Sequence, residues 1–183
     1  MLSRRQLLEL GAAAALLPVA CRQRERSSGP VVLNDIHSKL NATQVAGLAR
    51  PEGLDQLGTV IGKAGREGQT VSIAGGRHSM GGQQFGLDTL NLDTRSLNRV
   101  LSFDPARGVI EVEAGIEWPE LIGWCLANQP RGRPAWGIRQ KQTGADRLTL
   151  GGALASNIHG RGLTLSPIVG DVESLVLLGP DGE

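Results

Sequence analysis

The sequence has few cysteines and few aromatic residues, and both shortages exclude classes of protein. Its 183 residues include two Cys, too few for a disulfide scaffold or a cysteine-rich zinc module. Two Phe, three Trp and no Tyr provide no series of rings on which a single nucleic-acid strand could stack. Charge of one sign is also lacking, because 19 Lys and Arg stand against 18 Asp and Glu. We therefore expect no nucleic-acid partner, since neutralising a phosphate backbone needs a larger basic excess.

What remains is the composition of a soluble globular domain. Hydrophobic residues make up 40% of the chain and charged residues 20%, which argues against disorder. The basic excess lies in residues 1–28, which contain five Arg and two Glu, so the residues after 28 carry a net charge of −2. The part of the chain expected to fold is therefore slightly acidic.

Residues 1–21 have the order of a signal peptide, in which paired arginines precede an apolar run. The run from Leu10 to Ala20 is too short to cross a hydrocarbon core of about 30 Å as a helix, so we expect no permanent membrane span. Arg4 and Arg5 resemble the twin-arginine signal, which implies export of a folded protein; a general secretory signal is the alternative. Cys21 is a candidate lipid anchor, and cleavage near Ala20 without an anchor is the alternative.

The rest of the chain divides into a polar linker at 22–42 and one domain at 43–183. Hydrophobic periodicity and turn residues predict most of its elements. We expect strands at 45–49, 70–74, 89–92, 99–103, 109–113 and 172–178, helices at 51–65, 118–126 and 150–157, and a turn at 180–182. The Gly-, Pro-, Gln- and Arg-rich residues 128–147 are predicted to form a long polar connection.

Two glycine-rich segments, 75–82 and 151–162, carry the clearest functional signal, and each contains one of the three histidines. Glycine lets backbone N–H groups approach a phosphate closely, and a helix that begins at Gly151 adds the positive end of its dipole. Neither segment has the Lys-Ser/Thr of a phosphate loop or the Gly-x-Gly-x-x-Gly of a dinucleotide fold. Both segments are therefore predicted to bind an anionic group of another kind.

Four blocks, 71–83, 115–121, 148–160 and 169–178, resemble in their order the FAD-binding domain of the vanillyl-alcohol-oxidase class, also called the para-cresol-methylhydroxylase (PCMH) type. The resemblance covers residues 43–183. It implies an α+β fold with a small three-stranded β subdomain near 43–92, followed by a larger antiparallel or mixed sheet with flanking helices. It also implies that FAD lies between the two.

The resemblance implies cofactor contacts in both glycine-rich segments. The first loop would wrap the FAD pyrophosphate and the second would run along the other side of the flavin. The implied FAD-binding residues are Gly75, Gly76, Arg77, His78, Ser79, Met80, Gly81, Gly82, Gln83, Thr149, Gly151, Gly152, Ser156, Asn157, His159 and Gly160.

His78 is the sharpest of these candidates, because similar family members bond the histidine of this His-Ser motif to the 8α-methyl group of the flavin. A histidine that only hydrogen-bonds FAD is the alternative. Arg77 departs from the pattern, since those members often have Gly there. His159 is expected to contact the cofactor, with a loop histidine paired to backbone as the alternative.

The remaining distinctive side chains are expected to be structural. Trp118, Trp124 and Trp136 are predicted to lie in the core or in domain contacts rather than against substrate. Asp171 and Glu173 are predicted to be solvated or capping groups, because a lone carboxylate before an apolar strand is a weak catalytic signal.

The resemblance implies an exported FAD-dependent oxidoreductase that transfers a hydride to flavin from a C–H bond bearing an alcohol or amine. Its partner would be a small-molecule substrate, and no metal is implied. Members of the family continue into a substrate domain, so we expect this chain to be the amino-terminal part of a longer flavoprotein, and it names no catalytic base. Two alternatives stay open: a truncated fragment or interaction module without functional flavin binding, and an NADPH-dependent reductase of the same fold.

Overall fold

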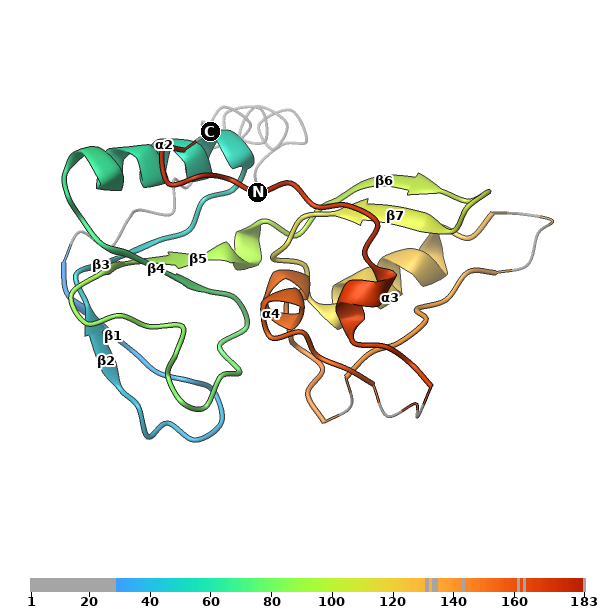
Figure 1. Cartoon of the computed structure of the whole chain (residues 1–183), viewed down its shortest axis with the longest axis horizontal. Helices are drawn as coiled ribbons and strands as arrows, with labels where there is room; N and C mark the ends of the chain where they lie inside the picture. The colour runs from blue at the N-terminus through green and yellow to red at the C-terminus, as the bar shows by residue number, and fades with distance from the viewer. Residues whose placement is uncertain are drawn as a thin grey trace, which may run out of the picture.

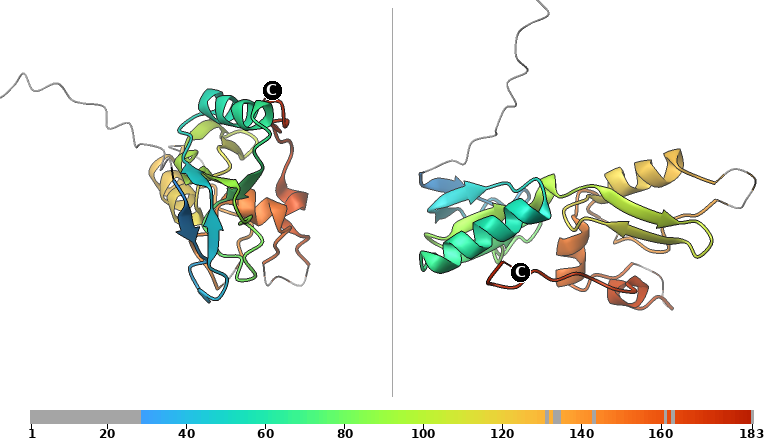
Figure 2. Two further views of the ribbon diagram at one scale, coloured as in Figure 1. Left: turned by 90° about the vertical axis from the view of Figure 1, so that its left-hand side faces the viewer. Right: turned by 90° about the horizontal axis from the view of Figure 1, so that it is seen from above.

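The computed structural model describes residues 29–130, 132, 135–142, 144–160, 162 and 164–182. The predicted signal segment, its paired arginines and Cys21 lie outside these residues. The described residues form two lobes that lie side by side along the longest axis of the molecule (Figures 1 and 2). No helix among them is long and apolar enough to cross a membrane.

The first lobe is built on three parallel strands in the order β3-β5-β4. These are β3 (Gly47–Ala49), β4 (Val71–Ala74) and β5 (Leu90–Asp93). An antiparallel pair precedes them, β1 (Val31–Leu33) and β2 (Thr43–Val45). The predicted three-stranded subdomain is thus confirmed, although the predicted strand at 45–49 is two short strands that belong to different sheets.

Helix α2 (Leu54–Arg66) covers one face of the parallel sheet (Figure 1). Its apolar face packs Val60 against Ala49 and Leu92, and these three residues form the small core of the lobe. The helix ends at Arg66, one residue after the predicted end, and Gly68 beyond it adopts a left-handed φ of +64° that glycine tolerates without strain.

The second lobe holds an antiparallel hairpin, β6 (Val100–Asp104) and β7 (Val109–Val112), with two helices. Helix α3 (Trp118–Ala127) begins with a capping box in which Glu117 and Glu120 satisfy each other's backbone N–H groups. Helix α4 (Leu150–Ala155) and the 3-10 turn η3 (Ile168–Asp171) complete the lobe. Its core consists of Ile116, Trp118, Leu121, Ala153 and Ile168.

Of the three tryptophans predicted to lie in the core or in domain contacts, Trp118 is in the core, whereas Trp136 is 42% exposed. Trp118 is buried in the core of the second lobe, and Trp124 meets Phe103 edge to face at 5.7 Å between ring centroids. Trp136 lies on the hairpin turn, where its Nε1 donates to the Pro105 carbonyl at 2.9 Å.

Asp171 and Glu173 hold ion pairs with the arginines of neighbouring loops. Asp171 binds Arg139 at 2.8 Å, and Glu173 binds Arg107 at 2.6 Å. Their expected structural role is consistent with these contacts.

One prediction for the second half is wrong in the described residues. The predicted antiparallel sheet with flanking helices is present as the β6/β7 hairpin, but residues 172–178 form no strand. That segment instead crosses from the second lobe to α2, where the turn at 180–182 packs on glycines of the helix (Figure 1). Val176 and Leu177 are more than 80% exposed, since no neighbouring strand pairs with them. An apolar run alone cannot specify a strand, because a strand also needs a hydrogen-bonding partner.

Candidate functional site

The first glycine-rich loop begins where β4 ends and packs directly against the start of α4. A Cβ at Gly75 would lie 2.1 Å from the Thr149 Oγ1 atom, and one at Gly76 would lie 2.3 Å from the Arg147 carbonyl oxygen. No side chain fits at either position without displacing the neighbouring segment. The first loop therefore meets the residues directly ahead of the second glycine-rich segment, with Gly75–Gly76 on one side and Arg147–Thr149 on the other.

Arg77 has a left-handed backbone with φ of +57°. This explains why Gly is the residue expected at this position, since other residues are strained there. The Arg77 Nε atom is buried without a hydrogen-bond partner. Burial lowers the pKa of Arg77, and the nearby positive charge of Arg95 lowers it further, while Asp93 opposes both effects. Arg77 thus brings a partly buried, incompletely satisfied guanidinium group to the junction.

His78 is held on one side only. Its Nδ1 atom lies 2.8 Å from Nε2 of His37, and the two ring centroids are 4.8 Å apart. Its Nε2 atom is buried and makes no hydrogen bond. Burial lowers the pKa of His78 and the charge of His37 adds to this, although the Arg147 backbone and Glu117 oppose the shift. The ring is therefore neutral at neutral pH, with one nitrogen committed and one unpartnered.

The rest of the loop is more open. Ser79, Met80, Gly81 and Gln83 are exposed, and Gly82 has a left-handed φ of +73°. The loop is closed by backbone hydrogen bonds from Gly82 to Ser79 at 3.1 Å and from Phe85 to Gly82 at 3.0 Å. These residues form a bent, solvent-facing rim after the half-buried residues 75–78.

The second glycine-rich segment has a buried start and an exposed end. Thr149 is buried and caps α4, accepting a hydrogen bond from the Gly152 N–H at 3.3 Å. Gly151 packs on Ala114, where an added Cβ would lie 3.0 Å away.

Beyond α4 the same segment is more exposed, and its distant hydrogen bonds join it to Gln140 and Ile168. Ser156, Asn157 and His159 are exposed, and Nδ1 of His159 lies 2.9 Å from the carbonyl of buried Gly160. Among the described residues, no hydrogen bond joins Ser156, Asn157, His159 or Gly160 to the 75–82 loop. The structure thus brings the start of the first segment together with the residues directly ahead of the second.

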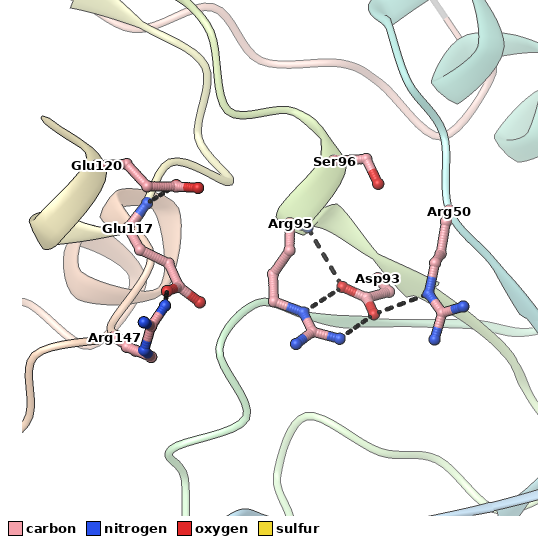
Figure 3. Close-up of a pocket in the computed structure, with 7 residues that line it drawn as sticks. All are labelled: Arg50, Asp93, Arg95, Ser96, Glu117, Glu120 and Arg147. Atoms are coloured by element: carbon pink, nitrogen blue, oxygen red, sulfur yellow. Dashed lines mark hydrogen bonds and ion pairs between the residues drawn. The ribbon is translucent and has the colours of Figure 1, made fainter. Parts of the chain in front are cut away.

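A polar cavity of about 450 Å³ lies between the lobes near this junction (Figure 3). Arg50 and Asp93 come from the carboxyl ends of the parallel strands β3 and β5, as Gly75 does from β4. Ligands of parallel sheets bind outside these ends. The lining residues are Arg50, Asp93, Arg95, Ser96, Glu117, Glu120 and Arg147.

Asp93 organises the first-lobe side of the cavity. Its side chain is 7% exposed and binds Arg95 at 2.6 Å and Arg50 at 3.2 Å (Figure 3). It also caps the 3-10 turn η2 (Thr94–Ser96). Burial raises the pKa of Asp93, but hydrogen bonds and charge from Arg95 outweigh this and hold the pKa below its ordinary value. Asp93 stays ionised and fixes both guanidinium groups at the cavity wall.

The second-lobe side of the cavity is more loosely built. Arg147, which is 72% exposed, binds Glu117 at 3.1 Å at the start of α3. Sequence reasoning singled out none of these cavity residues for binding. Arg50 and Asp93 each directly follow a predicted strand, and this position at a strand end is the sequence feature that could have identified them.

Comparison with known proteins gives a consistent result. Residues 45–183 match the family model described as an FAD binding domain. L-gulono-1,4-lactone dehydrogenase of Mycobacterium tuberculosis is 29% identical over 136 residues, which are 74% of this chain and 30% of that protein. The chain therefore spans about a third of the length of the curated relative that it matches.

Solved structures of alkyldihydroxyacetonephosphate synthase share the fold. In one crystal form the TM-score is 0.55 and the identity 22%, covering 66% of this chain and 23% of that one. In another the TM-score is 0.53 and the identity 19%, covering 67% and 22%.

The residues at the junction fit an FAD group. A pyrophosphate is an anion, and the junction offers backbone at Gly75–Gly76 together with the buried, unpartnered Nε of Arg77. The buried, unpartnered Nε2 of His78 lies beside them, and the cavity wall adds three further arginines. Polar groups buried without partners are costly, so a ligand that satisfied them would bind favourably here.

Proposed function

The chain belongs to the family of FAD-binding domains, and we propose that it holds FAD between its two lobes as part of an exported oxidoreductase, with His78 bonded to the flavin. The observation that carries this proposal is the meeting of Gly75–His78 with Arg147–Thr149. At that contact the buried Nε of Arg77 and Nε2 of His78 have no hydrogen-bond partner. The pyrophosphate of FAD would accept a hydrogen bond from Arg77 Nε, and its flavin ring would bond to Nε2 of His78.

Each part of the junction has its own task in this proposal. Backbone of the 75–82 loop and the Arg77 guanidinium bind the pyrophosphate, and Thr149 holds the start of α4 against the loop. Gly151, Gly152, Ser156, Asn157, His159 and Gly160 line the other side of the cofactor. The bound flavin supplies hydride acceptance, and the protein supplies position and exclusion of water.

The proposed hydride donor is a C–H bond that bears an oxygen, as in a sugar alcohol or sugar lactone. The name of the mycobacterial relative, a lactone dehydrogenase, supports this class of donor. An amine donor is the second class that the fold accommodates. Because the chain spans about a third of that relative, donor and activity are proposed for the whole flavoprotein.

Export is proposed from Arg4 and Arg5 alone, and a lipid anchor from Cys21. Arg4→Lys together with Arg5→Lys should retain the protein in the cytoplasm of a bacterial host, whereas Cys21→Ser should release it from the membrane fraction. Fractionation followed by immunoblotting measures both. Unchanged distribution of the double arginine variant would contradict twin-arginine export.

The flavin proposal is tested on the full chain by acid precipitation. The wild-type pellet should be yellow, His78→Ala should release all of its FAD into the supernatant, and the matched variant His159→Ala should keep flavin in the pellet. If all the FAD of the wild type appears in the supernatant, His78 is a contact only. A protein that binds no FAD at all would support the rival of a fragment or interaction module.

A further inference from the structure

We propose that the cavity between the lobes binds a small oxyanion, a phosphate or carboxylate group that does not belong to FAD, and that arginines from both lobes hold it. The cavity volume of about 450 Å³ is in the range of small-molecule sites. Among the described residues, those that line the cavity include none of the residues predicted to bind FAD. This inference therefore goes beyond the proposed function and does not rest on it.

Arg147 marks the boundary between the glycine-rich loop and the cavity. Its carbonyl oxygen packs on Gly76, where an added Cβ would lie 2.3 Å away. Its guanidinium group instead lines the cavity and binds Glu117 (Figure 3). The loop and the cavity therefore offer separate positions, one to the pyrophosphate of the cofactor and one to a second anion.

On the first-lobe side, Asp93 fixes two arginines and has no acceptor capacity left. Its Oδ1 atom accepts from the Arg95 backbone N–H at 3.3 Å and from Arg95 Nε at 2.8 Å. Its Oδ2 atom accepts from Arg95 Nη2 at 2.6 Å and from Arg50 Nε at 3.2 Å. A carboxylate has about four lone-pair sites, so all of them are used. Within the described part of the chain, Nη1 of Arg95 and both Nη atoms of Arg50 make no hydrogen bond and remain for a ligand.

On the second-lobe side, the carboxylates are engaged in holding the start of α3. Glu120 accepts from the Glu117 backbone N–H at 2.9 Å and from the Asn98 side chain at 3.1 Å. Glu117 accepts from the Glu120 backbone and from Arg147 Nη1, the latter at 3.1 Å. The Nε and Nη2 atoms of Arg147 make no hydrogen bond to any residue that the structure describes. This wall of the cavity therefore also keeps cationic N–H donors for a ligand.

The unused polar atoms of the cavity are complementary to an oxyanion. A guanidinium group has five N–H donors, so the free N–H groups of the three arginines outnumber the free lone pairs of the carboxylates. Guanidinium groups match the oxygens of phosphate and carboxylate groups, to which they donate two parallel hydrogen bonds. In the view of Figure 3, the Arg95 guanidinium lies between those of Arg50 and Arg147. An oxyanion bound there would join the two lobes.

The charges near the cavity also favour an anion. The lining residues include three arginines and three carboxylates, whose formal charges balance. Arg77 does not line the cavity but adds a positive charge nearby. Burial is the largest cause that lowers the pKa of Arg77, and the charges of Arg95 and Arg50 add to it. Asp93 opposes this shift without removing it. A bound anion would therefore reduce repulsion among these arginines.

The test measures anion binding to the full chain by isothermal titration calorimetry at constant ionic strength. Inorganic phosphate represents a free anion, D-gluconate represents the acidic end of a small metabolite, and D-glucose is the uncharged control. Phosphate and gluconate should bind both with and without FAD, whereas glucose should not bind. The anion that binds more tightly identifies the source of the group.

Variants from both lobes test the arginines. Arg50→Gln and Arg147→Gln should each weaken anion binding about tenfold, as expected for the loss of a charge-assisted hydrogen bond. Arg107→Gln is the matched control and should bind like the wild type, because Arg107 is paired with Glu173 and does not line the cavity. Circular dichroism confirms that each variant is folded. If Arg50→Gln does not fold, Arg50→Lys replaces it, since Lys can still bind Asp93 but lacks the paired donors of Arg.

Four outcomes decide the proposal. A wild type that binds neither anion would overturn it, as would equal affinities of Arg107→Gln and Arg147→Gln. A loss in Arg50→Gln without a loss in Arg147→Gln would contradict a site shared by the lobes. Loss of phosphate binding when FAD is bound would assign the cavity to the cofactor and also overturn the proposal. A chain that binds phosphate but no FAD would support this site and refute the proposed function.

Discussion

The two glycine-rich segments were predicted on the same grounds, yet the structure supports them differently. Residues 75–78 lie between Ile36–His37, which bond to Arg77 and His78, and Arg147–Thr149, and they carry buried polar atoms at the junction. Residues 156–160 are mostly exposed, and their hydrogen bonds to distant residues go to Gln140 and Ile168 rather than to the first loop. Glycine spacing therefore shows where backbones approach each other, whereas contacts from distant segments decide which side chains are placed for binding.

The most damaging change should be Gly75→Ala, which tests the enclosed segment. Its Cβ would overlap Thr149 Oγ1, so we expect a loss of about 3 kcal/mol in the free energy of unfolding and at least a tenfold loss of FAD affinity. Urea unfolding and FAD titration measure the two effects. Gly123→Ala in α3 is the matched control, because nothing lies within 4 Å of its added Cβ. Equal behaviour of the two variants would contradict the close approach of loop and helix.

The next effect should come from Asp93→Asn, which removes the charge that fixes the first-lobe arginines. The amide of Asn accepts hydrogen bonds from Arg95 and Arg50 more weakly than a carboxylate does. The free energy of unfolding should therefore fall by about 2 kcal/mol at neutral pH. Asp88→Asn on the surface is the control and should be neutral.

The contribution of Asp93 to the free energy of unfolding should also depend on pH. The folded-state pKa is below the ordinary value of about 3.9, so its stabilisation is complete above that value and disappears as pH falls through the folded pKa. Urea unfolding of wild type and Asp93→Asn should therefore converge in strong acid. A difference that is constant with pH would mean that charge is not what Asp93 contributes.

A smaller effect should separate the left-handed non-glycine residues of the two segments, Arg77 in the first and Asn157 in the second. Arg77→Gly should be more stable than Arg77→Ala by about 1 kcal/mol, because only Gly relieves the strain at φ of +57°. Asn157→Gly should differ from wild type by less than about 0.5 kcal/mol, since Asn tolerates this region. Both Arg77 variants should lose FAD affinity equally, which FAD titration can check against the unfolding data.

The smallest effect should appear in the segment that crosses between the lobes. Val176 is 86% exposed, so Val176→Ser should change the free energy of unfolding by less than about 0.5 kcal/mol. Ile168→Ser, which empties part of the second-lobe core, is the contrasting variant and should cost several times more. A large loss at Val176 would show that this segment is packed in solution.

Local signals in the sequence predicted local structure well. Hydrophobic periodicity predicted a helix at 51–65, where α2 lies, and strands at 99–103 and 109–113, where β6 and β7 lie. The prediction of a strand at 172–178 was wrong, because the segment itself does not show whether another strand pairs with it. The fold family was identified because its four blocks keep their order along the chain.

The site was only partly predictable for the same reason. The 75–82 loop carries its own glycine signature, but Arg50 and Asp93 meet only because β3 and β5 are adjacent in the sheet. His37 was hidden in a polar stretch read as a linker, because nothing local shows that its turn reaches residue 78. The sequence thus identified the glycine-rich loop of the site, whereas the side chains around the loop are brought there by the order of the strands.

The central claim is that FAD lies at the 75–78 junction and is bonded to His78. Trypsin cleaves after Arg77 and Arg95, so residues 78–95 form one peptide in which His78 is the only histidine. Mass spectrometry of the purified, FAD-loaded full chain should find that peptide heavier by the mass of the attached flavin, and unmodified in His78→Ala. An unmodified 78–95 peptide beside a flavin-bearing peptide from elsewhere in the chain would contradict the account.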